Sequence, residues 1–245
     1  MNARFYAPGN HAPGMLLNLS EEEAQHATRV LRLGVGAAIR IFDGRGQEFD
    51  STIVGVGKNS VQVEVGRLRP AAPEAGVAVT LVQAVLKGDK MDDVIRDAVM
   101  LGVAAIQPIV TERTAISLAA LNRGDRRERW ERVAVSSTKQ CGRAVVPAIG
   151  TPAPFGRAIL AAEDVLNVMC VEPGLAAGGS LVSSLPPRPP RAVQVLVGPE
   201  GGWTPEEVAR GVTSASLITL GGRTLRADAM ALVAITALLT HWREM

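Results

Sequence analysis

From Val77 onward the chain alternates apolar segments with amphipathic ones, and this alternation constrains its fold more than any other feature. Apolar runs of strand length predict strands over Val77–Leu86, Val103–Val110, Asp164–Cys170, Val193–Val197 and Ser216–Leu220. Helical patterns follow them over Met91–Leu101, Arg126–Thr138, Thr204–Arg210 and Ala227–Trp242. Such alternation predicts an α/β domain with a mainly parallel sheet.

The first 70 residues lack this alternation and predict β structure. Short apolar runs at Ala37–Phe42, Glu48–Val54 and Ser60–Val65 are separated by glycine-rich and Asn-Ser turns, which is typical of a small closed or half-closed β-barrel. One helix interrupts them, because Ser20 and three following glutamates form a capping-box start. A Pro- and Ala-rich linker, Arg69–Gly76, follows. We therefore expect two domains, residues 1–72 and 73–245.

Composition excludes several classes of protein. Two cysteines cannot form a disulfide framework, and three scattered histidines make a zinc site or a Ser-His-Asp triad improbable, so we expect no metal. The N-terminus has no apolar leader and no long run is free of charge, so we expect a cytoplasmic protein without a membrane partner. Since the formal net charge is only +2, phosphates would need a local cluster of basic residues.

The segment Leu196–Glu207 carries the densest chemical signal. A predicted strand runs directly into Gly198-Pro199-Glu200-Gly201-Gly202, and Thr204 with Pro205 then starts a helix. Glycines let the backbone approach a ligand closely, and loops at the carboxyl ends of parallel strands are where ligands bind. The spacing matches neither the dinucleotide fingerprint nor a P-loop. A tight turn without a ligand is the alternative interpretation.

A second strand end has the same design. Leu220 runs into Gly221-Gly222, and two arginines, Arg223 and Arg226, then precede a helix. Arginines at this position suit an anion or a developing negative charge, although a solvated helix start would look similar. Because the two glycine-rich ends are only about twenty residues apart, we expect them to share one pocket.

These two segments, Val-Gly-Pro-Glu-Gly-Gly-Trp-Thr and Leu-Gly-Gly-Arg-Thr-Leu-Arg, resemble the C-terminal signature of the SPOUT methyltransferases. Within that superfamily the chain is similar to the RsmE-type family, which methylates N3 of a uridine in 16S ribosomal RNA. The resemblance continues through Arg4–Tyr6, His26–Arg32, Lys87–Asp92, Leu101–Val103, Pro108–Thr114 and Lys139–Arg143. It departs at Asp228-Ala229-Met230, where the family usually has Glu-Thr-Ala, and this leaves the role of Asp228 open.

The resemblance implies a SPOUT-type α/β domain with a C-terminal trefoil knot, residues 73–245, preceded by a PUA-like β-barrel that binds RNA, residues 1–72. It implies S-adenosylmethionine as the cofactor and a homodimer, for which the apolar helix Ala227–Trp242 would supply an interface; a core helix is the alternative. The implied cofactor-binding positions are Glu172, Gly198, Pro199, Glu200, Gly201, Gly202, Leu220, Gly221, Arg223, Leu225 and Arg226.

The chemistry of uridine methylation suggests roles for two of these residues. The N3 imide is a poor nucleophile until it loses its proton, so the enzyme must stabilise negative charge on the uracil. Arg226 is the candidate for that task, and Glu200 is a candidate for accepting the proton, with Asp228 as another. Methylation at carbon commonly needs a cysteine nucleophile, whereas N3 methylation does not, so we expect Cys141 to contact RNA or the other subunit instead.

RNA contact must come from local positive charge. In the N-terminal domain Arg4, Arg29 and Arg32 are candidate phosphate ligands, and in the second domain Arg113 and Arg143 are. The expected partner is 16S ribosomal RNA within the small ribosomal subunit. Two other hypotheses remain open: a related SPOUT enzyme acting on a ribose 2′-OH or another base, and a non-catalytic RNA-binding protein of ribosome assembly. A Rossmann-type dehydrogenase is disfavoured because no Gly-x-Gly-x-x-Gly follows a strand.

Overall fold

The structure, a computed structural model, describes residues 2–158, 164–174 and 180–245. The chain divides into two compact units. Unit 1 comprises Met1–Glu74 and Thr138–Val146, and unit 2 comprises Ala75–Ser137 and Pro147–Met245. The predicted domain division at residue 73 stays a prediction. The two units differ from it chiefly because Thr138–Val146 belongs to unit 1.

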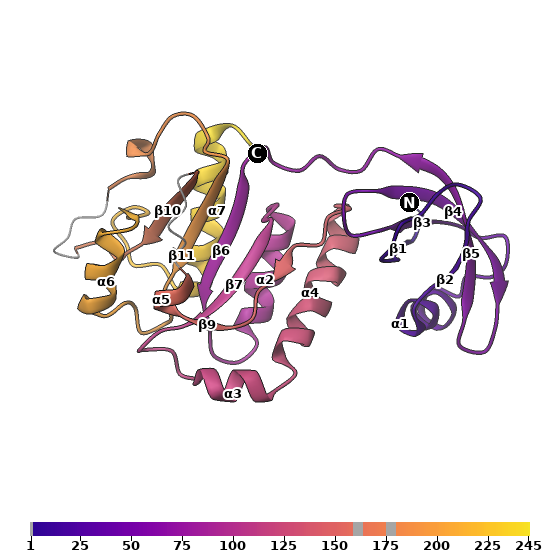
Figure 1. Cartoon of the computed structure of the whole chain (residues 1–245), viewed down its shortest axis with the longest axis horizontal. Helices are drawn as coiled ribbons and strands as arrows, with labels where there is room; N and C mark the ends of the chain where they lie inside the picture. The colour runs from indigo at the N-terminus through magenta and orange to yellow at the C-terminus, as the bar shows by residue number, and fades with distance from the viewer. Residues whose placement is uncertain (1, 159–163, 175–179) are drawn as a thin grey trace. The chain divides into compact units, whose positions relative to one another are not determined.

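Unit 1 is built on one mixed five-stranded sheet with the strand order β1-β3-β4-β5-β2 (Figure 1). β1 pairs parallel to β3, and the other neighbours are antiparallel. The strands are β1 (Arg4–Tyr6), β2 (Leu16–Asn18), β3 (Ala38–Phe42), β4 (Glu48–Val56) and β5 (Val61–Arg69). The predicted strands of the N-terminal region are thus confirmed. Alternate residues such as Phe5, Ile41 and Val63 are completely buried and form its core.

The helix predicted to start at Ser20 is confirmed. Helix α1 spans Glu21–Gln25, and a π-helical turn continues it over His26–Val30. The Ser20 hydroxyl accepts a hydrogen bond from the Glu23 backbone N–H at 3.3 Å, as the capping pattern predicts. Arg32 then adopts a left-handed conformation with φ +53°, which turns the chain toward β3.

Unit 2 contains a parallel sheet with the strand order β12-β10-β11-β6-β7-β8. The short strand β9 also pairs with β7, further along that strand than β8 does. The pairings between described strands are all parallel, which confirms the prediction from the alternating pattern. The strands are β6 (Ala78–Ala84), β7 (Ala105–Val110), β8 (Ala148–Ile149), β9 (Ala153–Pro154), β10 (Val165–Cys170), β11 (Ala192–Val197) and β12 (Ser216–Ile218). Central strands such as β11 are almost wholly apolar because both of their faces are covered.

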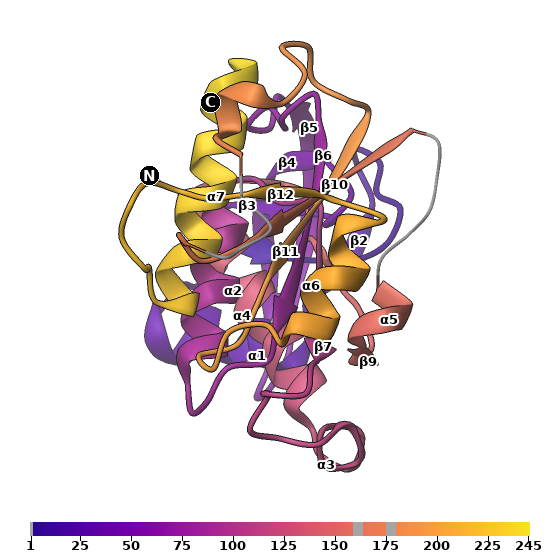
Figure 2. The ribbon, with the colours of Figure 1, turned by 90° about the vertical axis from the view of Figure 1, so that its left-hand side faces the viewer.

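Helices cover both faces of this sheet. Figure 2 shows α7, α2 and α4 on one face and α6 and α5 on the other. The helices of unit 2 are α2 (Lys90–Met100), α3 (Leu118–Arg123), α4 (Arg126–Cys141, whose last residues belong to unit 1), α5 (Phe155–Ala158), α6 (Pro205–Val212) and α7 (Ala227–Trp242). α3 and α5 were not predicted, because they are too short to show a clear helical period. Helix α7 is apolar on nearly every side because it packs on α2, β6 and β11.

The strand order is what creates a site. β11 follows β10 in the chain but lies between β10 and β6, so strands from distant parts of the sequence end side by side. The carboxyl ends of parallel strands lie at one edge of the sheet, and the loops that leave them converge there.

Candidate active site

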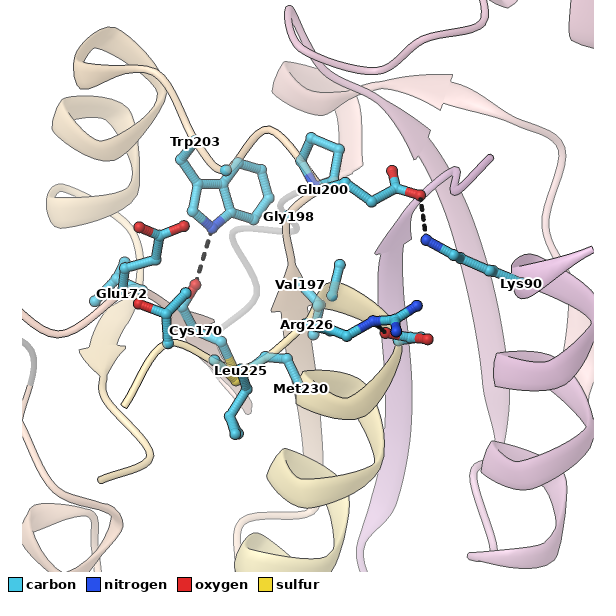
Figure 3. Close-up of a pocket in the computed structure, with 16 residues that line it drawn as sticks. Lys90, Cys170, Glu172, Val197, Gly198, Glu200, Trp203, Leu225, Arg226 and Met230 are labelled. Atoms are coloured by element: carbon cyan, nitrogen blue, oxygen red, sulfur yellow. Dashed lines mark hydrogen bonds and ion pairs between the residues drawn. The ribbon is translucent and has the colours of Figure 1, made fainter. Parts of the chain in front are cut away.

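A cavity of about 240 Å³ opens at the carboxyl ends of β10 and β11, beside the N-terminus of α7 (Figure 3). Three stretches of chain and one residue of α2, Lys90, line it; the stretches are the end of β10, the end of β11 with the glycine-rich loop that follows, and the segment that enters α7. The lining residues are Lys90, Cys170, Val171, Glu172, Val197, Gly198, Pro199, Glu200, Gly202, Trp203, Thr224, Leu225, Arg226, Ala227, Asp228 and Met230. The two predicted glycine-rich segments therefore contribute to one pocket.

The loop after β11, residues 198–203, has a tightly fixed path. The Gly202 N–H donates to the Pro199 carbonyl at 2.9 Å, and Gly202 has φ +69°, a conformation that favours glycine. The Trp203 ring packs on Gly198 so closely that an added Cβ would lie 3.0 Å from it. The Trp203 indole N–H also donates to the Cys170 carbonyl at 2.9 Å. These contacts connect the ends of β10 and β11.

Arg226 lies at the second segment, immediately before α7. Its side chain is 73% exposed, and its Nε lies 3.4 Å from the Asp228 Oδ1. It therefore presents a permanent positive charge at the mouth of the pocket, where a substrate can reach it. Asp228 is half-buried beside it and sits in the first turn of α7, where a negative charge is favoured by the helix dipole.

Glu200 faces the loop that follows β6. Its Oε1 accepts a hydrogen bond from the Lys87 backbone N–H at 3.1 Å and lies 3.4 Å from the Lys90 ammonium (Figure 3). Burial alone would raise the pKa of Glu200, but hydrogen bonds from backbone N–H groups and from Lys90 outweigh it and hold the pKa below its ordinary value. Glu200 is thus ionised at neutral pH and is a weak general base.

The two cysteines differ in their surroundings. Cys170 lines the pocket but is buried, and burial raises the pKa of its thiol to about 12, so it is inert as a nucleophile. Cys141 lies at the end of α4, within unit 1, and its Sγ contacts the Thr138 carbonyl at 3.7 Å.

Comparison with known proteins identifies the family. Residues 73–239 match the family model described as an RNA methyltransferase domain, and residues 19–66 match the one described as an RNA methyltransferase PUA domain. The chain belongs to the RNA methyltransferase family.

Relatives along nearly the full length carry a more specific name. A Synechocystis protein named ribosomal RNA small subunit methyltransferase E is 30% identical, with 91% of this chain and 73% of that protein covered. The crystal structure of a ribosomal RNA small subunit methyltransferase E from Neisseria gonorrhoeae, bound to S-adenosylmethionine, is 29% identical. It has a TM-score of 0.89 and covers 99% of this chain and 98% of its own. A Legionella pneumophila protein solved with bound S-adenosylmethionine gives 30% identity, 98% coverage of both chains and a TM-score of 0.89.

Most of the cofactor-binding positions predicted for this RNA methyltransferase lie at the pocket. Those that line it are Glu172, Gly198, Pro199, Glu200, Gly202, Leu225 and Arg226. Gly201, Leu220, Gly221 and Arg223 do not line it. The pocket is also lined by residues that were not predicted to bind the cofactor, among them Lys90, Cys170, Val197 and Trp203. The rule that ligands bind at strand ends could have found Cys170 and Val197, which are the last residues of β10 and β11.

Two of the five arginines predicted to bind RNA are buried and form ion pairs within the protein. Arg4 is 8% exposed in its side chain and pairs with Glu48, and Arg143, 7% exposed, pairs with Glu74. A buried guanidinium whose N–H groups are bonded to protein acceptors cannot reach a phosphate without breaking those bonds. This burial argues against RNA contact by these two residues, and their contact with RNA stays a prediction.

The other three predicted RNA ligands remain available to solvent. Arg29 and Arg32 are exposed on unit 1, and Arg113 is exposed on unit 2. Their contact with RNA stays a prediction.

The helices of the described ranges include none that is long and apolar enough to span a membrane. Within those same ranges, no group of three or more His, Cys, Asp and Glu side chains is arranged to hold a metal ion.

Proposed function

We propose that this chain transfers a methyl group from S-adenosylmethionine to N3 of a uridine in 16S ribosomal RNA. The observation that carries the proposal is the single pocket lined by both glycine-rich segments. It is supported by relatives named ribosomal RNA small subunit methyltransferase E and by the Neisseria gonorrhoeae structure with bound S-adenosylmethionine.

The residues at the pocket fit this methyl donor. Three carboxyl groups line it, those of Glu172, Glu200 and Asp228, against two cations, Lys90 and Arg226, which gives 2 − 3 = −1. A net negative lining suits a positively charged sulfonium. The apolar side chains of Val197, Leu225 and Met230 offer surface for a flat aromatic base. When bound, S-adenosylmethionine supplies an electrophilic methyl group.

The chain's own task is then to orient the uracil and to stabilise its anionic form. We assign the second role to Arg226, because its exposed cation stands at the pocket mouth and cannot act as a base. The lowered pKa of Glu200 makes proton acceptance by this carboxylate inefficient. We therefore propose that Glu200 acts as a fixed negative charge that also holds Lys90 in place.

The same proposal includes a trefoil knot in unit 2 and a homodimer. Support for the knot is the high TM-score to the Neisseria gonorrhoeae structure and the placement of β11 between β10 and β6. Support for the dimer comes from α7, which is largely apolar and yet leaves one apolar side chain, Val233, 42% exposed. A second copy of the chain could cover this side chain. Sedimentation at several protein concentrations would test the dimer.

The experiment that tests the function uses the full chain, labelled S-adenosylmethionine and small ribosomal subunits that lack the modification. After digestion, the labelled nucleoside is identified. We expect 3-methyluridine. A 2′-O-methylated nucleoside or another methylated base would indicate a different RNA methyltransferase. Absence of label, with no binding of S-adenosylmethionine by calorimetry, would indicate a non-catalytic protein.

The role of Arg226 has its own test. Replacing Arg226 with Ala should lower turnover by at least about a hundredfold, the range lost when one stabilising donor is removed from other active sites. Binding of S-adenosylmethionine should change little, because the side chain is mostly exposed. Near-normal turnover of Arg226→Ala would refute the assignment.

A further inference from the structure

We propose that Arg113 and Glu207 are positioning residues that hold the donor loop, defined as residues 198–203, in the conformation that shapes the pocket. Neither residue lines the pocket. Arg113 bonds to backbone carbonyls of the donor loop, and Glu207 accepts from backbone N–H groups directly after the donor loop and in the loop after β7. The inference rests on the proposed function, in that the donor loop is taken to bind S-adenosylmethionine.

Arg113 binds the donor loop from its outer side. Its Nη1 donates to the Gly201 carbonyl at 2.9 Å and to the Trp203 carbonyl at 3.2 Å. Its side chain also packs on Gly201, since an added Cβ at that glycine would lie 3.1 Å from the Arg113 Cβ. Hydrogen bonds from a guanidinium are charge-assisted and are stronger than neutral ones. One cation therefore fixes two of the six residues whose path defines the pocket wall.

Glu207 ties the same region together from the first turn of α6. Its Oε2 accepts from the Thr204 N–H at 3.0 Å, and its Oε1 accepts from the Glu112 N–H at 3.1 Å. The first bond completes the capping box of α6, and the second reaches the loop after β7. Glu207 is 5% exposed and its bond with the Thr204 N–H is buried, so that N–H would be left without an acceptor if the carboxylate were lost.

The loop after β7 is itself rigid, which makes it an effective support. Thr111 and Thr114 close it, because their hydroxyl oxygens lie 2.9 Å apart and the Thr111 N–H donates to the Thr114 Oγ1 at 3.0 Å. β6 separates β7 from β11 in the sheet. The contacts of Arg113 and Glu207 therefore bridge over the end of β6 and brace the donor loop against a fixed turn.

The test measures binding of S-adenosylmethionine by calorimetry without RNA. We expect Arg113→Ala to weaken binding at least tenfold and Glu207→Gln, which keeps the shape but turns one acceptor into a donor, to weaken it severalfold. Arg132→Ala is the matched control, because Arg132 is exposed on α4 away from the pocket lining. It should bind like the wild type.

A second readout separates positioning from general destabilisation. Hydrogen exchange in the peptide spanning residues 198–207 should become faster in Arg113→Ala, while exchange in β7 stays unchanged. If Arg113→Ala fails to fold, Arg113→Lys carries the test; it keeps a cation but loses the planar guanidinium, so severalfold weaker binding at an unchanged melting temperature is expected.

Three results would count against the inference. Unchanged binding of S-adenosylmethionine by Arg113→Ala or Arg113→Lys overturns it while leaving the proposed function intact. Unchanged binding together with a raised KM for RNA would return Arg113 to the role of a phosphate ligand. Failure of the wild-type protein to bind S-adenosylmethionine would overturn the proposed function and the inference together.

Discussion

Replacing Arg4 with Ala should destabilise unit 1 rather than weaken RNA binding directly. The Arg4 guanidinium donates to both Glu48 carboxylate oxygens, at 3.3 and 3.1 Å. It also donates to the carbonyls of Thr138, Lys139 and Arg143, at 3.0, 2.8 and 2.7 Å. It thus connects β1 to β4 and to the segment 138–146, which explains why that segment belongs to unit 1.

The size of the effect follows from burial. In the Arg4–Glu48 pair the side chains are 8% and 4% exposed. Removing one partner of a buried ion pair costs about 3–5 kcal/mol, because the other charge is left without compensation. Arg40 lies 3.9 Å from Glu48 and offsets part of this cost, so we expect a value near the lower end of that range. With a urea slope of about 1–3 kcal/mol/M, the unfolding midpoint of unit 1 should fall by at least about 1 M.

The two units can be followed separately. The single tyrosine, Tyr6, lies in unit 1, whereas Trp130, Trp203 and Trp242 lie in unit 2. Tryptophan fluorescence during urea titration therefore reports unit 2, and hydrogen exchange in β1, β3 and β4 across the same titration reports the unfolding of unit 1. Arg29→Ala is the control, because Arg29 is exposed and contacts only Asn59 among the hydrogen bonds described for it. A wild-type midpoint for Arg4→Ala, together with weaker RNA binding, would refute this reasoning.

Three further predictions concern the pocket. Gly202→Ala should weaken binding of S-adenosylmethionine by up to about thirtyfold in calorimetry, because a left-handed conformation costs an L-residue ~1–2 kcal/mol and the new Cβ would lie 3.1 Å from Glu172; unchanged affinity would contradict this. A thiol reagent should label Cys141 but not Cys170 in the native protein, and Cys141→Ser should stay active; rapid labelling of Cys170 would show that it is not buried. Because the Glu200 pKa is lowered, its carboxylate is fully charged at every pH above the ordinary glutamate pKa. The charge is lost only when the pH falls through the lowered pKa, which is far from neutrality. Glu200→Gln should therefore leave the pH dependence of turnover near neutrality unchanged, and the loss of a limb there would identify Glu200 as the base.

Local features of the fold were predictable because local sequence encodes them. Apolar runs gave β6, β10 and β11 nearly to the residue, and Thr204 with Pro205 marked the start of α6. The elements that sequence analysis missed are short: β1 and β2 have three residues each, and α5 has four. Their pairing partners stabilise them, so their own sequences carry little signal.

Roles of charged residues were less predictable. Arg29 and Arg4 look equivalent in sequence, yet Arg29 is exposed and Arg4 is buried on an acid 44 positions away. Arg143 likewise meets Glu74, 69 positions away. The sequence gives the charge and the side-chain length of an arginine. Whether a carboxylate pairs with it depends on which strands become neighbours in the fold.

The sequence by itself determined that two strand ends carry glycines and lead into helices, since backbone freedom and helix capping are properties of a few consecutive residues. Only the tertiary structure decided that the loop after β11 and residues 224–226 line one cavity, that Lys90 lines it with them, and that Arg113 bonds to the donor loop. The physical reason is that strand order sets these contacts, and strand order results from packing the whole sheet between its helices.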